Sequence, residues 1–230
     1  MSNPAFGLGA YSPSEAARLT GLPSSQLRRW LFGYSYDRDG MKTVQAPLWR
    51  PEYGANQEEP LLGFRDLIEA RMVGNLRKLG IGLPTIRICL QTAAAIANDD
   101  HPFSSTGFRT DGQRLFLERI GDEGQHDVLD LKTGQHNFAK IVEKSFLDLD
   151  FDDEKATRWF LSKKRTIVAD PERSFGQPIT TEAGVPTRRI AQAVVAEGSV
   201  EKVARLFEIA VGAVRDAVTF EMGLKERMAA

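Results

Sequence analysis

The chain has 230 residues, of which 42% are hydrophobic and 27% are charged, and its formal net charge is -1. This length allows one large or two modest domains with a real core. The net charge excludes a uniformly basic surface, so any contact with nucleic acid must come from a local patch. Such a patch spans residues 18–50, where Arg18, Arg28, Arg29, Arg38, Lys42 and Arg50 are accompanied only by the acidic residues Asp37 and Asp39.

Cysteine usage and hydropathy bound the class of protein further. Cys89 is the only cysteine, so the chain can form neither an intrachain disulfide nor a thiolate metal cluster. The N-terminus lacks the basic and apolar regions of a signal peptide, and no apolar run approaches the ~20 residues that cross a bilayer. We therefore expect a cytoplasmic protein that does not bind a membrane.

Residues 11–31 have the pattern of a helix-turn-helix. Ser12 can cap a first helix that begins at Pro13, and Gly21 lies where two helices must turn sharply. A second helix follows, with Ser24 or Ser25 as its expected cap. A plain αα-hairpin would have similar spacing, so this alternative stays open.

The second predicted helix has an apolar and a polar face. Leu27 and Trp30 lie three residues apart on the apolar face. Gln26, Arg28 and Arg29 lie on the other face, where guanidinium and amide groups suit phosphates and purine edges. This helix is therefore our candidate for reading DNA.

Residues 33–60 contain turn formers around two short runs, 41–45 and 47–50, which favour a β-hairpin wing. A wing would bring Lys42, Thr43 and Arg50 beside a groove or a phosphate. For each of these residues a plain surface loop is the alternative. Further on, apolar residues at helical spacing predict a helix over 63–79 with one apolar stripe, and another from Pro84 to about Ala97.

The succession SPSEAARLTGL, SSQLRRW, a wing and FRDLIEARMVGNLRKLGIGLPTIRICL resembles the DNA-binding domain of the MerR family of transcription regulators. The resemblance covers about residues 10–97. It implies that Ser24, Ser25, Gln26, Arg28 and Arg29 face DNA, while Leu27 and Trp30 hold the recognition helix. MerR regulators continue into a long dimerising helix. Here the helical pattern stops at residues 98–105, so the resemblance does not extend to the dimerising helix.

Residues 101–164 are expected to form a β-rich middle. Apolar and polar residues alternate on either side of residues 121–124, which predicts a hairpin, and residues 138–147 have helical spacing. The acidic run 148–154 lacks the glycine and the bidentate carboxylate of a calcium loop. We expect a solvated acidic turn there, with a docking surface for a basic partner as the alternative.

No enzyme motif is present in the sequence. His101, His126 and His136 lack metal-site or catalytic spacing, so we expect them to be ordinary surface residues of loops. One acidic turn does not supply the converging carboxylates of a nuclease. We predict no catalytic residue, no cofactor and no metal.

The C-terminal part begins with two expected short strands, 166–169 and 177–181, and helices follow from Thr187. Residues 199–218 repeat the opening motif. Glu208 stands where the first motif has Gly21, which weakens the match at the turn. On the exposed face, Arg215 is the one side chain that would bind DNA strongly. We therefore favour packing or dimerisation for this second unit. Its residues Ala204, Ile209, Val214 and Ala217 match Ala17, Leu22, Leu27 and Trp30 of the first.

Residues 165–222 are similar to a small domain of VapB-type antitoxins, on the positions of Gly176, Pro178, Gly184 and Pro186. The family's usual Thr-Arg after the second glycine is replaced here by Val-Pro-Thr. The resemblance implies a PIN-like ribonuclease toxin as partner. Cations could cover that toxin's magnesium-binding carboxylates, and the candidates are Arg158, Lys163, Lys164, Arg188 and Arg189, each of which could also be an ordinary solvated side chain.

Together these features predict an α+β, mainly helical fold with a MerR-like winged helix-turn-helix over residues 1–100, a β-rich middle over 101–164 and a C-terminal helix-turn-helix domain over 165–230. The predicted function is that of an antitoxin that silences its toxin and represses its own operon as a homodimer on operator DNA. A MerR-like regulator whose middle senses a ligand is the main alternative, and a scaffold protein is a third.

Overall fold

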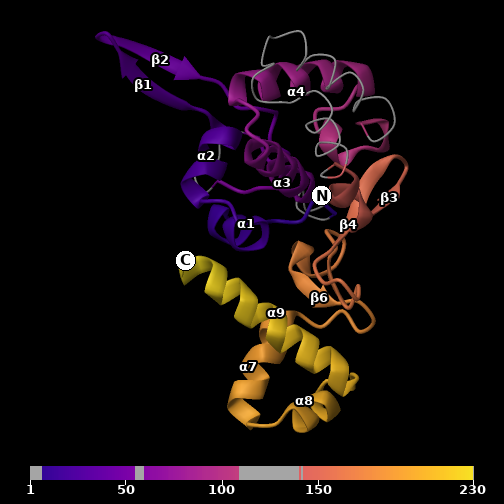
Figure 1. Ribbon diagram of the computed structural model, residues 1–230. Helices are drawn as coiled ribbons and strands as arrows, with labels where there is room; N and C mark the ends of the chain where they lie inside the picture. Colours follow the sequence, from indigo (N-terminus) through magenta and orange to yellow (C-terminus); the bar gives the residue numbers. More distant parts are fainter. Residues whose placement is uncertain (1–6, 55–59, 109–139, 141, 230) are drawn as a thin grey trace, which may run out of the picture.

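The computed structural model describes residues 7–54, 60–108, 140 and 142–229 (Figure 1). Helices and strands are mixed, which confirms the α+β class. The N-terminal half contains α1 (Pro13–Thr20), α2 (Ser24–Phe32), β1 (Tyr34–Arg38), β2 (Met41–Gln45), α3 (Phe64–Lys78), α4 (Leu83–Ala97) and the short 3-10 helix η1 (Pro102–Ser104). The rest contains β3 (Leu149–Asp152), β4 (Lys155–Phe160), β5 (Ile167–Ala169), the 3-10 helix η3 (Ser174–Gly176), β6 (Pro178–Thr180), α7 (Thr187–Glu197), α8 (Val200–Leu206) and α9 (Val211–Ala229).

The start of α1 is fixed by a reciprocal capping box. The Ser12 hydroxyl accepts a hydrogen bond from the Glu15 backbone N–H (3.2 Å), and the Glu15 carboxylate accepts one from the Ser12 backbone N–H (2.9 Å). Gly21 ends the helix in the left-handed conformation, with φ 71°. These features confirm the predicted first helix and its turn.

The second helix begins differently from our expectation. Pro23 occupies the N-cap position, and Ser24 is already the first helical residue, so the expected cap by Ser24 or Ser25 is wrong. A proline side chain has no oxygen that could accept a hydrogen bond from the first turn. The first backbone N–H groups of α2 therefore receive no side-chain cap.

The wing is a two-stranded antiparallel hairpin, as predicted, but its strands are not the expected pair. β1 pairs with β2 from Tyr34 opposite Gln45 to Arg38 opposite Met41, whereas the run 47–50 forms no strand. Leu48 and Trp49 are instead buried in the core. The Leu48 backbone N–H donates to the Trp30 carbonyl at 2.7 Å, which fixes the chain after the wing against the end of α2.

Helix α3 lies at the centre of the N-terminal core, and its buried surface is wider than the one apolar stripe that the sequence predicted. Ten of its 15 residues are buried, including the charged residues Asp66 and Glu69. Gly74 lies against the helix-turn-helix, since a Cβ added there would come within 2.8 Å of the Leu22 side chain. α3 therefore supports α1 and α2 directly.

The described part of the middle contains a four-stranded antiparallel sheet in the order β3-β4-β5-β6. The predicted hairpin around residues 121–124 lies outside the described residues. Residues 142–147 are helical, as expected. The acidic run is not only a solvated turn: Leu149–Asp152 forms strand β3, and only Asp153 and Glu154 form the turn, with φ 44° and 67°. The predicted strands around 167 and 179 are confirmed.

The C-terminal helices form a small bundle with its own core of Ile190, Val203, Ala204, Val214 and Ala217. Helix α9 runs from this bundle towards α1 (Figure 1). There Leu224 joins the N-terminal core, and Glu221 accepts hydrogen bonds from Arg18 (3.1 Å) and from the Thr187 hydroxyl (2.6 Å). The domain boundaries at residues 100 and 164 stay a prediction. No helix in the described ranges is long and apolar enough to span a bilayer.

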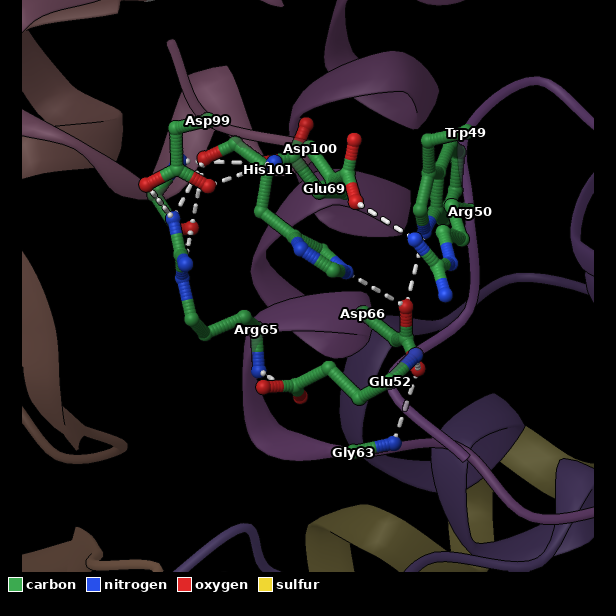
Figure 2. A network of polar contacts seen from close by, with 11 residues as sticks. Trp49, Arg50, Glu52, Gly63, Arg65, Asp66, Glu69, Asp99, Asp100 and His101 are labelled. Carbon is green, nitrogen blue, oxygen red and sulfur yellow. Dashed lines mark hydrogen bonds and ion pairs between the residues drawn. The ribbon is translucent and has the colours of Figure 1, made fainter. Parts of the chain in front are cut away.

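A buried polar network surrounds the N-terminal end of α3 (Figure 2). One oxygen of Asp66 accepts a hydrogen bond from Trp49 Nε1 (2.8 Å) and lies 3.0 Å from His101 Nε2. Its other oxygen accepts from the backbone N–H groups of Gly63 (2.9 Å) and Glu52 (3.2 Å). His101 is only 5% exposed, so its expected surface position is wrong.

The charges of this network shift each other's pKa. Burial raises the pKa of Glu69 to about 8, although His101 and Arg65 oppose the shift. Burial and the charge of Asp66 raise the pKa of Glu52 to about 7. Burial alone would lower the pKa of His101, but its hydrogen bond to Asp66 and the nearby carboxylates outweigh burial and raise it. One Glu69 oxygen, Oε2, is buried without a partner among the described residues, which also favours the protonated carboxyl.

The raised pKa values make stability depend on pH. Folding binds protons at Glu69, Glu52 and His101, so the free energy of unfolding should fall as pH rises from about 5 to about 8, by up to about 1.4 kcal/mol for every tenfold gain in proton affinity on folding. Glu69→Gln removes one of the groups that take up a proton on folding, so the free energy of unfolding of this variant should change less with pH. Urea unfolding across the pH range measures it. Glu197→Gln, at an exposed site on α7, is the control; an unchanged slope for Glu69→Gln would contradict the assignment.

The junction between α2 and the wing depends on Gly33. Its φ of 70° and ψ of -175° lie in a region restricted to glycine, and an added Cβ would come within 2.4 Å of the Gln45 carbonyl oxygen. Gly33→Ala should therefore lower the free energy of unfolding by about 2–4 kcal/mol. Gly40→Ala, at the wing tip, meets no atom within 4 Å despite its φ of 76° and should cost only about 1–2 kcal/mol. Equal losses in thermal unfolding would refute the proposed clash at Gly33.

Candidate nucleic-acid interface

Helix α2 presents the face that the sequence predicted. Leu27 and Trp30 are buried against the core, with 0% and 3% exposure. Arg28 and Arg29 are exposed on the other face. Ser25 is also exposed, whereas Ser24 and Gln26 are half-buried at the start of the helix. The helix is therefore held by its apolar side chains and directs its two guanidinium groups outward.

No carboxylate of the described residues neutralises either arginine. In the described part of the chain neither Arg28 nor Arg29 forms an ion pair; Arg29 lies over the ring of Tyr34, with 5.5 Å from its guanidinium carbon to the ring centre. An exposed guanidinium without a carboxylate partner keeps its donors available for phosphate or guanine. This pair of side chains is the centre of the candidate interface.

The wing projects from the end of α2 and stands away from the rest of the molecule (Figure 1). Lys42 is exposed and lies opposite Asp37 in the hairpin, and Thr43 is half-buried opposite Tyr36. Both residues lie on β2, the second strand of the hairpin that follows α2. The structure thus brings Lys42 and Thr43 into the same region as α2, and their role in DNA binding stays a prediction.

Two arginines of the predicted basic patch lie elsewhere. Arg50 follows the wing, and its Nη1 is 3.8 Å from an oxygen of Asp100, near the C-terminal end of α4; both side chains are strongly exposed, so the pair is weak. Arg18 is mostly buried in its ion pair with Glu221 of α9. Arg18 is thus a structural residue, and among the described side chains of the patch Arg28, Arg29 and Lys42 remain as exposed cations on α2 and the wing.

The second helix-turn-helix has the predicted geometry. Ser199 caps α8, and Glu208 takes the left-handed conformation with φ 55°, at the place where the first motif has glycine. Val214 and Ala217 are fully buried in the bundle core. Arg215 lies 3.5 Å from Glu201, and this exposed pair partly neutralises the charge of Arg215. Whether this unit dimerises stays a prediction.

The cations that were candidates for toxin binding lie on separate elements. Arg158 on β4 is held by Asp170 at 3.1 Å. Lys163 and Lys164 lie in the exposed turn between β4 and β5, where Lys164 is 4.0 Å from Asp216. Arg188 and Arg189 are exposed on the first turn of α7. Their role in toxin binding also stays a prediction.

Glu52, Asp66 and His101 form a group with metal-like spacing, since one ligand atom from each lies within 4.8 Å of the others. Both oxygens of Asp66 are already occupied by four contacts to nitrogen atoms. A metal ion would have to displace these hydrogen bonds, so the group serves the fold. Sequence reasoning missed the buried network around Asp66, although the carboxylates of Asp66 and Glu69, three residues apart within an apolar helix, were a possible signal.

Residues 9–90 match the family model described as "Putative DNA-binding HTH domain". This range contains α1, α2, the wing and α3, and it ends within α4. The matched region is therefore the one that carries Arg28, Arg29 and Lys42. The MerR family itself is not identified by this match.

Two comparisons extend over nearly the whole chain. It is 27% identical over 226 residues to "Putative antitoxin VapB45" of Mycobacterium tuberculosis, which covers 93% of this chain and 94% of that protein. The crystal structure of Rv2018 from Mycobacterium tuberculosis superposes with a TM-score of 0.64 at 20% identity, over 90% of this chain and 96% of that one. The second likeness shows the fold. Together the findings support a helix-turn-helix protein similar along its length to a VapB-type antitoxin.

Proposed function

We propose that the chain is an antitoxin that represses its own operon by binding operator DNA through α2 and the wing. The observation that carries the DNA-binding part is the pair of exposed guanidinium groups, Arg28 and Arg29, on a helix whose opposite face is buried. The antitoxin part is supported by the similarity to VapB45 along almost the entire chain.

Helix α2 offers two kinds of DNA contact. Arg28 and Arg29 can reach base edges or phosphates from the exposed face. The uncapped first turn adds backbone N–H groups beside Ser24 and Ser25, which suit a phosphate at a helix N-terminus. Gln26 can pair with adenine if the side chain turns outward. Lys42 and Thr43 would reach the neighbouring DNA backbone from the wing. Arg50 stays a candidate too, because its ion pair with Asp100 is weak and can be exchanged for a phosphate contact.

Repression by one recognition helix per chain favours a homodimer. Two helices that read successive major grooves on one side of DNA are separated by one helical turn, ~34 Å. A symmetric dimer would place two copies of α2 on a palindromic site. DNA and toxin both lie in the cytoplasm, which is where this function requires the protein to act.

The partner we propose is a PIN-like ribonuclease toxin. Such an enzyme binds magnesium through several carboxylates, and an inserted guanidinium or ammonium group can take over the metal's charge. Arg188 and Arg189 are the preferred candidates because both are exposed on one turn of α7. Lys163 is exposed as well, whereas Arg158 and Lys164 are already close to Asp170 and Asp216.

Replacing Arg28 and Arg29 with alanine should weaken binding to DNA from upstream of the operon by about 1–3 kcal/mol for each side chain. If both contact phosphates, the slope of log K against log salt should fall by about 2. Fluorescence anisotropy at several salt concentrations measures both effects. Arg205→Ala, at an exposed site on α8, is the matched control, and equal affinities for all three proteins would reject the assigned face.

Co-expression with the neighbouring reading frame tests the antitoxin part. The two products should co-purify, and the chain should abolish ribonuclease activity of the partner. Charge reversal of Arg188 and Arg189 to glutamate should weaken the complex at least about tenfold, whereas Lys225→Glu, exposed on α9, should not. Failure of the wild-type proteins to associate would remove the antitoxin function and leave DNA binding untouched.

A further inference from the structure

The wing carries an unusual amount of exposed apolar surface. Tyr34 and Tyr36 on β1 are 43% and 40% exposed, and Met41 on β2 is 71% exposed. Positions 34, 36 and 38 of β1 share one face of the hairpin, because every second residue of a strand lies on the same face. Met41 shares this face because it lies directly opposite position 38. We call this set, Tyr34, Tyr36 and Met41, the tyrosine face.

The tyrosine face continues the exposed face of α2. The Arg29 guanidinium lies 5.5 Å from the Tyr34 ring centre, and the rings of Tyr34 and Tyr36 are 5.8 Å apart. Arg29, Tyr34 and Tyr36 thus form an unbroken row from the recognition helix into the wing. Whatever meets Arg28 and Arg29 can meet this row without leaving the same surface.

Charge distinguishes the two faces of the wing. No acidic residue stands at the register positions of the tyrosine face, where Thr43 and Gln45 oppose the tyrosines. Asp37 lies on the other face, opposite Lys42. A face with aromatic rings and hydroxyls, next to two guanidinium groups and without a carboxylate, suits a polyanion with stacked bases.

The contacts within the wing leave much of this apolar surface exposed. An isolated two-stranded hairpin has no core beneath it, and this one stands away from the molecule (Figure 1). The wing is held at its base, where Arg87 donates to the carbonyls of Ala46 (2.9 Å) and Pro47 (2.5 Å). A hydrogen-bonded base and an exposed apolar end suit an element that is inserted into a partner.

We propose that the tyrosine face enters the minor groove next to the major groove read by α2, and that Tyr36 and Met41 act as an apolar wedge against a base step. This inference rests on the proposed DNA-binding function. Unstacking a step costs a few kcal/mol and costs least at flexible pyrimidine–purine steps. The wedge would therefore select such a step at a fixed distance from the bases read by α2, without hydrogen bonds to it.

The test uses the full-length protein and DNA from upstream of its own operon. Footprinting first locates the bound site, and 2-aminopurine is then placed at successive positions across it. Wild-type protein should raise the fluorescence at one step beside the α2 footprint, because an unstacked 2-aminopurine is no longer quenched. The double variant Tyr36→Ser with Met41→Ser should reduce this rise at least about threefold. Lys42→Ala, on the opposite face, should lower the affinity but keep the rise.

The outcomes separate this inference from the proposed function. If the wild-type protein gives no footprint, the DNA-binding function itself fails. If it gives a footprint but no fluorescence change, or if the double variant keeps the full rise, DNA binding stands and the wedge is overturned. If the double variant loses self-association in sedimentation while it keeps the fluorescence rise, the tyrosine face is an interface between copies of this chain.

Discussion

Helix α3 lies in the middle of the N-terminal core with two carboxylates on its buried surface, and this arrangement requires polar partners for both of them. Asp66 has four nitrogen contacts, from Trp49, His101, Gly63 and Glu52. Glu69 accepts a hydrogen bond from the Ser104 backbone N–H at 2.9 Å. Because a buried polar or charged group is far more costly without hydrogen bonds than with them, these contacts bind the loop after the wing and the chain after α4 to α3.

The orientation of α2 follows from this core. Leu22 packs on α3 at Gly74, Leu27 and Trp30 enter the core, and the Leu48 N–H donates to the Trp30 carbonyl. These contacts bury one side of α2, so the opposite side, with Arg28 and Arg29, is exposed. The direction of the wing is set by the backbone conformation of Gly33, which only glycine adopts readily. A recognition helix and a wing on one surface are thus consequences of packing behind them.

Helix α9 joins the C-terminal bundle to the N-terminal core. Glu221 of α9 is 6% exposed and has two partners, Arg18 of α1 and Thr187 at the start of α7. An ion pair with so little solvent contact holds its geometry better than a surface pair. The same α1 that packs against the recognition helix therefore contacts α9, a helix of the second helix-turn-helix, so these contacts connect the two proposed functional regions.

Local chemistry was enough to predict much of this protein. The first helix and its turn follow from helix capping at Ser12 and Pro13 and from the conformational freedom of Gly21. The spacing of Leu27 and Trp30 identifies which side of α2 is buried. Capping, turn conformation and helical spacing could all be predicted because each depends only on residues close together in the sequence. The sequence alone could not show that Pro47–Arg50 is excluded from the wing, that Arg18 is taken by Glu221, or that His101 is buried beside Asp66. The last two outcomes join residues 203 and 35 positions apart. All three were decided by tertiary packing, which selects among partners that local patterns leave equally possible.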